Sequence, residues 1–271
     1  MIMAWMSGPT SIFRHKLVFN LLDRISPQKI LEVGFGNGDL LLKMNKLGYK
    51  GLGIDFSSTA VEEFIKKTKG MPLTFSVRNC TAENLISAED RFDLVVACEV
   101  LEHIQDDNNT LKTWNQLLAD SGHLLLSVPA HMKKWGHNDE YAGHMRRYEK
   151  EEVTTKLKEA NFEVVQLYSY GYPFSNWAKL AGDKLIKKKV KTEASLEERT
   201  KESGIHNLHF KFGKILINDL TLHPFYLFQK AFLNADLGVG YVVLAKKKVS
   251  EIKSTPAGSR VRKSNRNSKH L

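Results

Sequence analysis

The sequence predicts a doubly wound α/β fold, in which helices cover both faces of a mostly parallel sheet. Short apolar runs alternate with stretches whose apolar residues recur at helical spacing. The runs are continuously apolar, as expected of strands that are buried on both faces. A glycine-rich turn, Gly34 to Gly38, follows the first strand, and such sheets bind ligands at the carboxyl ends of their strands.

The elements follow from these patterns in chain order. A first helix is predicted over residues 9–25, because apolar residues such as Phe13, Leu17 and Leu21 recur on one face. The first half then alternates a strand at 29–34, a helix at 39–47, a strand at 51–55, a helix at 57–69 and a strand at 73–77. The second half continues with a strand at 92–98, a helix at 107–119, a strand at 122–128, a helix at 150–160 and a strand at 162–168, and a last strand at 241–245 follows a long helical and irregular segment.

Composition and charge restrict the class of protein. The 271 residues suffice for one domain, here placed at residues 1–248, and no apolar run approaches the roughly 20 residues of a membrane span. The two cysteines, Cys80 and Cys98, are expected to be reduced thiols. With no secretory signal at the start, we expect a cytoplasmic protein.

The formal net charge of +10 is concentrated near the C-terminus. Residues 249–271 hold six Lys or Arg against one acidic residue and almost no apolar side chain. We expect a disordered, basic tail that serves mainly as a solvated extension. Binding to nucleic acid or to an anionic surface is the alternative.

The glycine-rich turn points to a nucleotide-like cofactor. Gly34, Gly36 and Gly38 alternate with other residues, so backbone can approach a ligand without a Cβ in the way. The dinucleotide pattern G-x-G-x-x-G would need a glycine at position 39, where this chain has Asp39. NAD is therefore disfavoured. Glu32, before the first glycine, could orient the turn or reach a cofactor ammonium group through water.

Further polar residues follow the next strands. Asp55 ends the second strand, at the distance from the first glycine where an acid can accept hydrogen bonds from ribose hydroxyls. Residues 80–85 follow the third strand, and the fourth strand continues into Cys98, Glu99 and the segment up to Ile104. All of these residues should meet at the same edge of the sheet.

With these stretches in place, the chain resembles the class I S-adenosylmethionine-dependent methyltransferases, in particular the bacterial group acting on small molecules. The resemblance covers roughly residues 28–170. It implies a Rossmann-like, seven-stranded sheet with an antiparallel last strand, and S-adenosyl-L-methionine as cofactor. The stretches that carry it are Glu32–Gly38, Gly53–Asp55, Ala82–Leu85, Phe92–Ile104, Val128–Ala130 and Gly143–Tyr148.

The resemblance also implies roles for the residues of the cofactor site. The loop of Gly34, Gly36 and Gly38 would face the methionine part, together with Glu32, and Asp55 would bind the ribose. Phe56 and Ala82 would contact the adenine, and Thr81 stands where the family often has Asp. Cys98 and Glu99 would lie beside the sulfonium.

The loop after the fifth strand holds the candidate catalytic groups. Methyl transfer from a sulfonium mainly requires a nucleophile held in line, and a general base is optional. The candidate catalytic side chains are His144, His131 and Tyr148, with His103 after the fourth strand, and Asp139 and Arg146 are candidates for substrate contacts. The alternative for this loop is that His144, Arg147 and Tyr148 only brace it. The histidines at 131, 137 and 144 lack usual zinc spacings, so no metal is expected.

Two segments are expected to close over the site. Residues 1–28 would form an N-terminal helix and lid, and residues 171–236 a helical lid insertion. The insertion is aromatic, and Tyr172 and Trp177 are candidates for gripping an apolar or planar acceptor. Packing of these aromatic side chains onto the sheet is the alternative.

The expected function is methylation of an oxygen or nitrogen atom of a small metabolite or peptide natural product. One alternative is a lipid-linked acceptor at a membrane surface, since residues 177–190 are basic and amphipathic and residues 225–232 are aromatic. Another is a nucleic-acid methyltransferase or binder that uses the tail. The fourth strand lacks the Asp/Asn-Pro-Pro-aromatic element of adenine-methylating enzymes, so nucleic acid is disfavoured. No obligate protein partner is expected.

Overall fold

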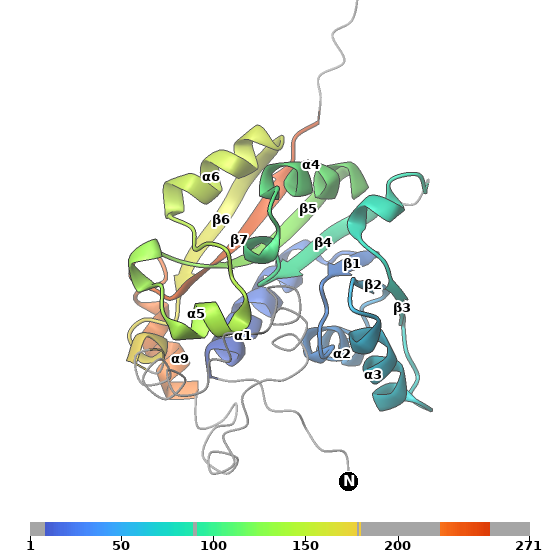
Figure 1. Ribbon diagram of the computed structural model, residues 1–271, viewed down its shortest axis with the longest axis horizontal. Coiled ribbons are helices and arrows are strands. Elements are labelled where there is room, and N and C mark those ends of the chain that lie inside the picture. The colour runs from blue at the N-terminus through green and yellow to red at the C-terminus, as the bar shows by residue number, and fades with distance from the viewer. Residues whose placement is uncertain (1–8, 89–90, 178, 180–222, 250–271) are drawn as a thin grey trace, which may run out of the picture.

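The computed structural model describes residues 9–88, 91–177, 179 and 223–249, and these form a seven-stranded sheet flanked by helices (Figure 1). The N-terminal half contains α1 (Pro9–Ile25), β1 (Ile30–Val33), α2 (Asp39–Lys46), β2 (Gly51–Asp55), α3 (Ser58–Thr68), β3 (Phe75–Asn79) and η1 (Ala82–Leu85). The central part contains β4 (Phe92–Cys98), η2 (Leu101–His103), α4 (Asp107–Leu117), β5 (Leu118–Pro129), η3 (Met132–Lys134) and α5 (His137–Ala142). The remaining elements are α6 (Lys150–Glu159), β6 (Phe162–Tyr170), α9 (His223–Lys230) and β7 (Gly240–Lys247).

The strand order explains where the site lies. The order is β3-β2-β1-β4-β5-β7-β6, and β7 runs antiparallel to both of its neighbours. The chain moves outward from β1 through β2 to β3 and then returns to place β4 on the other side of β1. The order therefore reverses between β1 and β4, and the carboxyl ends of these strands open a crevice there. The predicted fold class, with its antiparallel last strand, is confirmed.

Two apolar cores cover the two faces of the sheet. One core joins the sheet to α4 and α6 through side chains such as Trp114 and Leu157. The other joins it to α1, α2 and α3, where Leu17, Leu41 and Phe64 are buried. In Figure 1, α4 and α6 lie on one side of the sheet and α1, α2 and α3 on the other. α1 therefore belongs to the same helical layer as α2 and α3, because its apolar side chains pack directly on the strands.

Most predicted boundaries agree with the structure, and β6 and β7 each end two residues later than predicted, while β3 and β5 differ at their starts. β3 begins at Phe75 rather than at residue 73, because Leu73 is 37% exposed and only Phe75 reaches the buried register with Gly51. β5 begins at Leu118, since Leu118 already pairs with Phe92 before a bulge. The predicted helix over residues 107–119 accordingly ends two residues early, at Leu117.

Two predicted segments are described only in part or not at all. The predicted lid insertion at 171–236 is described at residues 171–177, 179 and 223–236, and the rest lies outside the described residues. The predicted basic tail lies outside them from residue 250 onward. None of the described helices is long and apolar enough to cross a membrane.

Candidate functional site

A cavity of about 800 Å³ opens at the carboxyl ends of β1, β2 and β4. This volume is within the usual range for sites of small organic ligands, about 300–1,000 Å³. Predicted cofactor residues line it from one end to the other: Glu32, Gly34, Gly36, Asp55, Phe56, Thr81, Ala82, Cys98 and Glu99. The structure therefore brings together nine of the ten residues assigned to the cofactor, and Gly38 supports the loop from behind.

Only glycine suits positions 34 and 38, because the backbone there has a positive φ and a Cβ atom would clash with neighbouring side chains. Gly34 has φ +67°, and a Cβ there would lie 2.6 Å from Cγ2 of Val100. Gly38 has φ +74°, and a Cβ there would lie 2.2 Å from the ring of Phe64. Both φ values belong to the left-handed region, which costs an L-residue about 1–2 kcal/mol. The loop therefore keeps bare backbone against the cavity.

Asp55 joins the second strand to the glycine loop. One carboxylate oxygen, Oδ2, accepts a hydrogen bond of 2.8 Å from the backbone N–H of Gly36. The other, Oδ1, accepts one of 2.9 Å from the backbone N–H of Ser57. Burial raises the pKa of Asp55, and the two N–H donors act against that rise. A carboxylate held in this way still has lone pairs with which to accept hydrogen bonds from ribose hydroxyls.

Glu32 supplies an independent test of whether the cavity fits the cofactor. Its carboxyl group is 4% exposed and lines the cavity, and Oε2 has no hydrogen-bond partner among the described residues. Burial, and next the charge of Asp55, raise its pKa well above the ordinary value. A buried carboxyl oxygen without a donor is costly, and the ammonium group of the methionine part is a donor of the required kind. The residues fit S-adenosylmethionine.

The other end of the cavity is formed where β4 ends. Glu99 has φ +56°, and its Oε1 accepts a hydrogen bond of 2.9 Å from Ser127 and lies 3.4 Å from Nη1 of Arg14. Burial raises the pKa of the Cys98 thiol to about 12, so this thiol is neutral and a poor nucleophile. Cys98 therefore shapes the wall, and Glu99 supplies the charge.

Among the cavity residues that sequence reasoning missed are Arg14 and His15 of α1. The first helix was expected to cover the site, but no local pattern marks which of its polar side chains turns inward. Nδ1 of His15 lies 3.3 Å from the ammonium group of Lys43. Burial, followed by the charges of Arg14 and Lys43, lowers the pKa of His15 to about 2. This ring is therefore neutral and accepts the hydrogen bond from Lys43.

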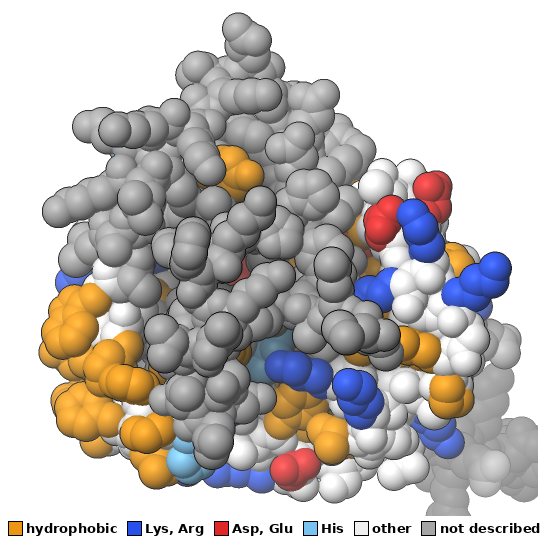
Figure 2. Space-filling view, turned by 90° about the horizontal axis from the view of Figure 1, so that it is seen from below, with side chains coloured by type: hydrophobic (Ala, Val, Ile, Leu, Met, Phe, Trp, Pro, Cys, Tyr) orange, Lys and Arg blue, Asp and Glu red, His pale blue; other side chains and the backbone are white. Residues whose placement is uncertain are grey.

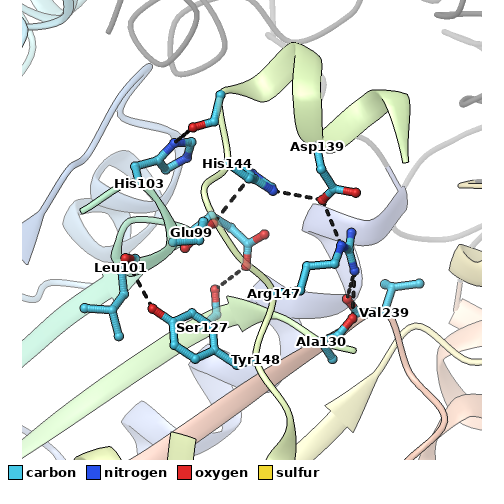
Figure 3. A network of polar contacts seen from close by, with 12 residues as sticks. Glu99, Leu101, His103, Ser127, Ala130, Asp139, His144, Arg147, Tyr148 and Val239 are labelled. Carbon is cyan, nitrogen blue, oxygen red and sulfur yellow. Dashed lines mark hydrogen bonds and ion pairs between the residues drawn. The ribbon is translucent and has the colours of Figure 1, made fainter. Parts of the chain in front are cut away.

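Two of the predicted catalytic histidines meet at this end of the cavity. The rings of His103 and His144 have centroids 4.9 Å apart in an edge-to-face arrangement, and both residues line the cavity. Nδ1 of His103 lies 3.1 Å from the carbonyl oxygen of Gly143, and Nδ1 of His144 lies 2.9 Å from Oδ1 of Asp139 (Figure 3). Burial lowers the pKa of His103 to about 4, so its ring is neutral.

The comparisons with known proteins agree with this geometry. Residues 10–167, more than half of the chain, match the family model described as a methyltransferase domain. The chain belongs to the methyltransferase domain family. This family and the seven-stranded fold agree with the class I S-adenosylmethionine-dependent methyltransferase that the sequence predicts.

Individual curated relatives match a smaller part of the chain than the family model does. A ubiquinone biosynthesis O-methyltransferase from Cereibacter sphaeroides is 33% identical over 100 residues, which cover 37% of this chain and 40% of that protein. The chain thus matches only about two fifths of the length of this curated relative.

Among solved structures, N-methyltransferase NodS from Bradyrhizobium japonicum, in complex with S-adenosyl-L-homocysteine, has a TM-score of 0.50 at 23% identity, covering 61% of this chain and 82% of NodS. The [4+2]-cyclase SpnF has a TM-score of 0.56 at 14% identity, covering 87% of this chain and 81% of SpnF. These likenesses concern the fold alone.

Several side chains assigned to the acceptor region lie outside the cavity of this methyltransferase. Tyr148 is fully buried, and its hydroxyl donates a hydrogen bond of 2.9 Å to Oδ2 of Asp107. Arg146 binds the same carboxylate, with Nη1 2.9 Å from Oδ2. His131 is 3% exposed and lies between carboxylates, with Nδ1 2.9 Å from Glu149 and Nε2 3.3 Å from Asp236. These groups brace the loop, and for Tyr148 this is the alternative that the sequence left open.

Asp139 also sits behind the cavity rather than in its wall. It is 1% exposed, and its Oδ1 accepts hydrogen bonds from Nε of Arg147 at 2.8 Å and from the ring of His144. Its Oδ2 lies 3.0 Å from Nζ of Lys179. Burial alone would raise its pKa, but the hydrogen bonds from His144 and Arg147 hold it well below the ordinary value. Asp139 is therefore an anion that orients His144.

The aromatic candidates belong to a cluster at one edge of the methyltransferase. The ring of Tyr172 lies 5.2 Å from that of Phe232, and the ring of Trp177 lies 5.8 Å from that of Phe174. Trp177 is 64% exposed and does not line the cavity. Figure 2 shows hydrophobic side chains gathered at the left of one face, the side on which Figure 1 places α9.

Proposed function

We propose that this methyltransferase transfers the methyl group of S-adenosylmethionine to an oxygen or nitrogen atom of a small-molecule acceptor. One observation carries the proposal: a single cavity has the Asp55–Gly36 contact at one end and the rings of His103 and His144 at the other. The first end suits a ribose and the second suits a protic nucleophile. An oxygen acceptor is favoured, because the curated relatives are named as O-methyltransferases.

The chain's own residues bind, orient and exclude water. The glycine loop and Asp55 would fix the cofactor, and Glu32 would accept a hydrogen bond from its ammonium group. The bound sulfonium supplies an already activated methyl group, so the protein chiefly has to hold the acceptor atom in line. His103 and His144 line the acceptor end of the cavity, where they can hold the acceptor hydroxyl in position. Arg14 and Glu99 would shape the floor on which the acceptor rests.

Calorimetric titration tests the cofactor half of this proposal. The protein is titrated with S-adenosylmethionine, with S-adenosylhomocysteine and with NAD. We expect micromolar binding of the first two and none of NAD. Tight binding of NAD would overturn the proposal.

Acceptor screening tests the second half. Transfer of a radiolabelled methyl group is measured with three matched sets of compounds: phenols, aromatic carboxylic acids and aromatic amines. We expect labelled product from the phenols. If the protein binds the cofactor and only the amines are labelled, the acceptor atom is nitrogen and not oxygen. If none of the three sets is labelled, the acceptor is not a small aromatic compound of these kinds.

A lipid-linked acceptor is a second candidate, supported by the exposed aromatic cluster. Trp177, Phe225 and Phe228 are 64%, 41% and 52% exposed. Lys230 belongs to α9, as Phe225 and Phe228 do, and its Nζ lies 5.3 Å from the ring centre of Tyr226. Exposed aromatic side chains beside cations suit an anionic bilayer surface. Co-sedimentation with anionic vesicles tests this candidate, and we expect Trp177→Ala together with Phe228→Ala to abolish it. Failure of the wild-type protein to sediment would exclude it.

A further inference from the structure

Three potential metal ligands converge beside the cavity. Glu102 and His103 come from η2, and His144 comes from the loop after α5, so they are brought together only by the fold. One ligand atom from each residue can be chosen so that all three lie within 4.8 Å of one another. In Figure 3, His103 and His144 lie on the same side of the network, with Glu99 beneath them.

Glu102 is the unusual member of this group. Its side chain is fully buried, and neither of its carboxyl oxygens has a hydrogen-bond partner among the described residues. Nε2 of His144 lies 3.7 Å from Oε1. Such a carboxyl group is costly unless something pairs with it, and a cation at this position would do so.

Hydrogen bonds to Nδ1 fix the orientation of both imidazoles. A carbonyl oxygen can only accept, so the contact with Gly143 requires the proton of His103 to be on Nδ1. The contact of His144 with the anionic Asp139 places its proton on Nδ1 as well. In both rings Nε2 then carries the lone pair that a metal ion needs. Fixing a ligand histidine through its other nitrogen, by a carboxylate or a carbonyl, is the usual arrangement around protein metals.

The outer groups are themselves fixed. Asp139 is anchored by Arg147, by Lys179 and by the backbone N–H of Gly136 at 2.9 Å. The backbone N–H of Met145 donates a hydrogen bond of 3.0 Å to the carbonyl of Glu102, which ties the loop of His144 to η2. The ligand atoms are thus held by a rigid outer shell, although their residues are distant in sequence.

We propose that Glu102, His103 and His144 bind a divalent transition-metal ion such as Mn²⁺, Fe²⁺ or Zn²⁺. Two imidazole nitrogens and one carboxylate oxygen favour these ions over Mg²⁺ and Ca²⁺, which prefer oxygen ligands throughout. Three protein ligands leave coordination positions open, and His103 and His144 line the cavity. The ligand for those positions is an oxygen of the acceptor.

This inference rests on the proposed function and narrows its acceptor class. A metal-bound hydroxyl loses its proton more easily than a free one, so a phenol or catechol could present an anionic oxygen to the methyl group. The proton would leave to solvent or to a neighbouring base, and no oxidant or reductant is needed. In this arrangement His103 and His144 position the metal ion and do not act as general bases.

Metal binding can be tested without measuring methyl transfer. The protein is stripped with a chelator and titrated with Mn²⁺ while the signal of free Mn²⁺ is followed by electron paramagnetic resonance. Calorimetric titrations with Zn²⁺ and Mg²⁺ run in parallel. We expect a single saturable site per chain for Mn²⁺ and Zn²⁺ and much weaker binding of Mg²⁺. The variants Glu102→Gln and His144→Gln should weaken Mn²⁺ binding at least tenfold. Even changes to residues that only support metal ligands typically reduce metal affinity by about 10- to 100-fold.

The matched control is His123→Gln. His123 lies in β5, opposite Lys246, and away from the cavity, so this variant should bind Mn²⁺ as the wild type does. Circular dichroism and titration with S-adenosylmethionine verify that each variant is folded. The absence of a saturable site in the wild type would overturn the proposal, as would unchanged binding by both ligand variants.

Asp55→Ala separates this inference from the proposed function. It should lose S-adenosylmethionine binding and keep Mn²⁺ binding, because Asp55 is not part of the metal cluster. A wild type that binds S-adenosylmethionine but no metal would overturn the metal site alone. A wild type that binds Mn²⁺ but no S-adenosylmethionine would overturn the proposed cofactor and leave the metal site supported.

Discussion

The carboxylate of Asp55 accepts a hydrogen bond of 2.8 Å from the backbone N–H of Gly36, which ties the end of β2 to the middle of the glycine loop. The two residues come from neighbouring parallel strands, so their contact depends on the register of β1 with β2. A single carboxylate thereby shapes the loop and faces the cavity.

Asp55→Asn should weaken S-adenosylmethionine binding by roughly 10- to 100-fold, since a hydrogen bond to a charged group contributes about 1.5–3 kcal/mol. Calorimetry measures the change. Asp93→Asn is the matched control, because Oδ2 of Asp93 accepts hydrogen bonds from the backbone of Gln28 and Lys29 outside the cavity. It should lower stability and leave cofactor affinity unchanged. Equal losses of affinity in both variants would contradict a specific role for Asp55.

Gly34→Ala should destabilise the protein and reduce cofactor binding. The left-handed φ costs about 1–2 kcal/mol for alanine, and the new Cβ would also displace Val100. Gly48→Ala is the comparison, since Gly48 has φ +84° and open space around it. It should show only the conformational cost in urea unfolding and bind cofactor normally. Adding Val100→Ala to Gly34→Ala should restore part of the stability; no restoration would mean that the steric contact is unimportant.

Arg147→Met should lower the free energy of unfolding by about 3 kcal/mol, because it removes a buried ion pair with Asp139 together with the hydrogen bonds that the guanidinium donates to the carbonyls of Ala130 and Val239. Asp139 is 1% exposed. Arg146→Met, from the same loop, should cost about 1 kcal/mol or less, because Asp107 keeps its contacts with Lys156 and Tyr148. Urea unfolding measures both variants. Similar costs for the two variants would refute the special position of Arg147.

Stability should decrease as the pH falls below about 6.5. The folded chain keeps His15 neutral down to a pKa of about 2, whereas in the unfolded chain it takes up a proton near its ordinary pKa. The contribution of His15 is therefore fully present above pH 6.5 and is lost progressively in acid, by at most about 1.4 kcal/mol per pH unit. His15→Gln should flatten this slope in urea unfolding between pH 7.5 and 4.5. An unchanged slope would show that His15 does not control it.

Local patterns were enough to predict the strands of the sheet and the cofactor end of the site. Glycines, strand-end acids and continuous apolar runs have meaning over a few residues, and βα units repeat the same geometry along the chain. Once β1, β2 and β4 were correctly placed, the parallel sheet itself brought Gly34, Asp55 and Cys98 to one edge. The ends of strands were harder to predict. β3 is an example, because it lies at the edge of the sheet and most of its residues are not buried.

The acceptor end depended on contacts between distant segments. His144, His131 and Tyr148 looked alike in one polar loop, yet only His144 reaches the cavity, and the other two are held by Glu149 and Asp107. Arg14 approaches Glu99 from a helix far away in sequence. Spacing along the chain could not reveal either arrangement.

The sequence by itself thus determined the family, through its motifs, and the glycine loop and the succession of strands and helices along the chain, because these depend on residues close together in sequence. Only the tertiary structure decided which polar side chains share a cavity, and it alone brought Glu102, His103 and His144 to one point. The physical reason is that side-chain direction in loops is set by burial and by partners from other segments, as the buried carboxylate of Asp139 sets the direction of His144.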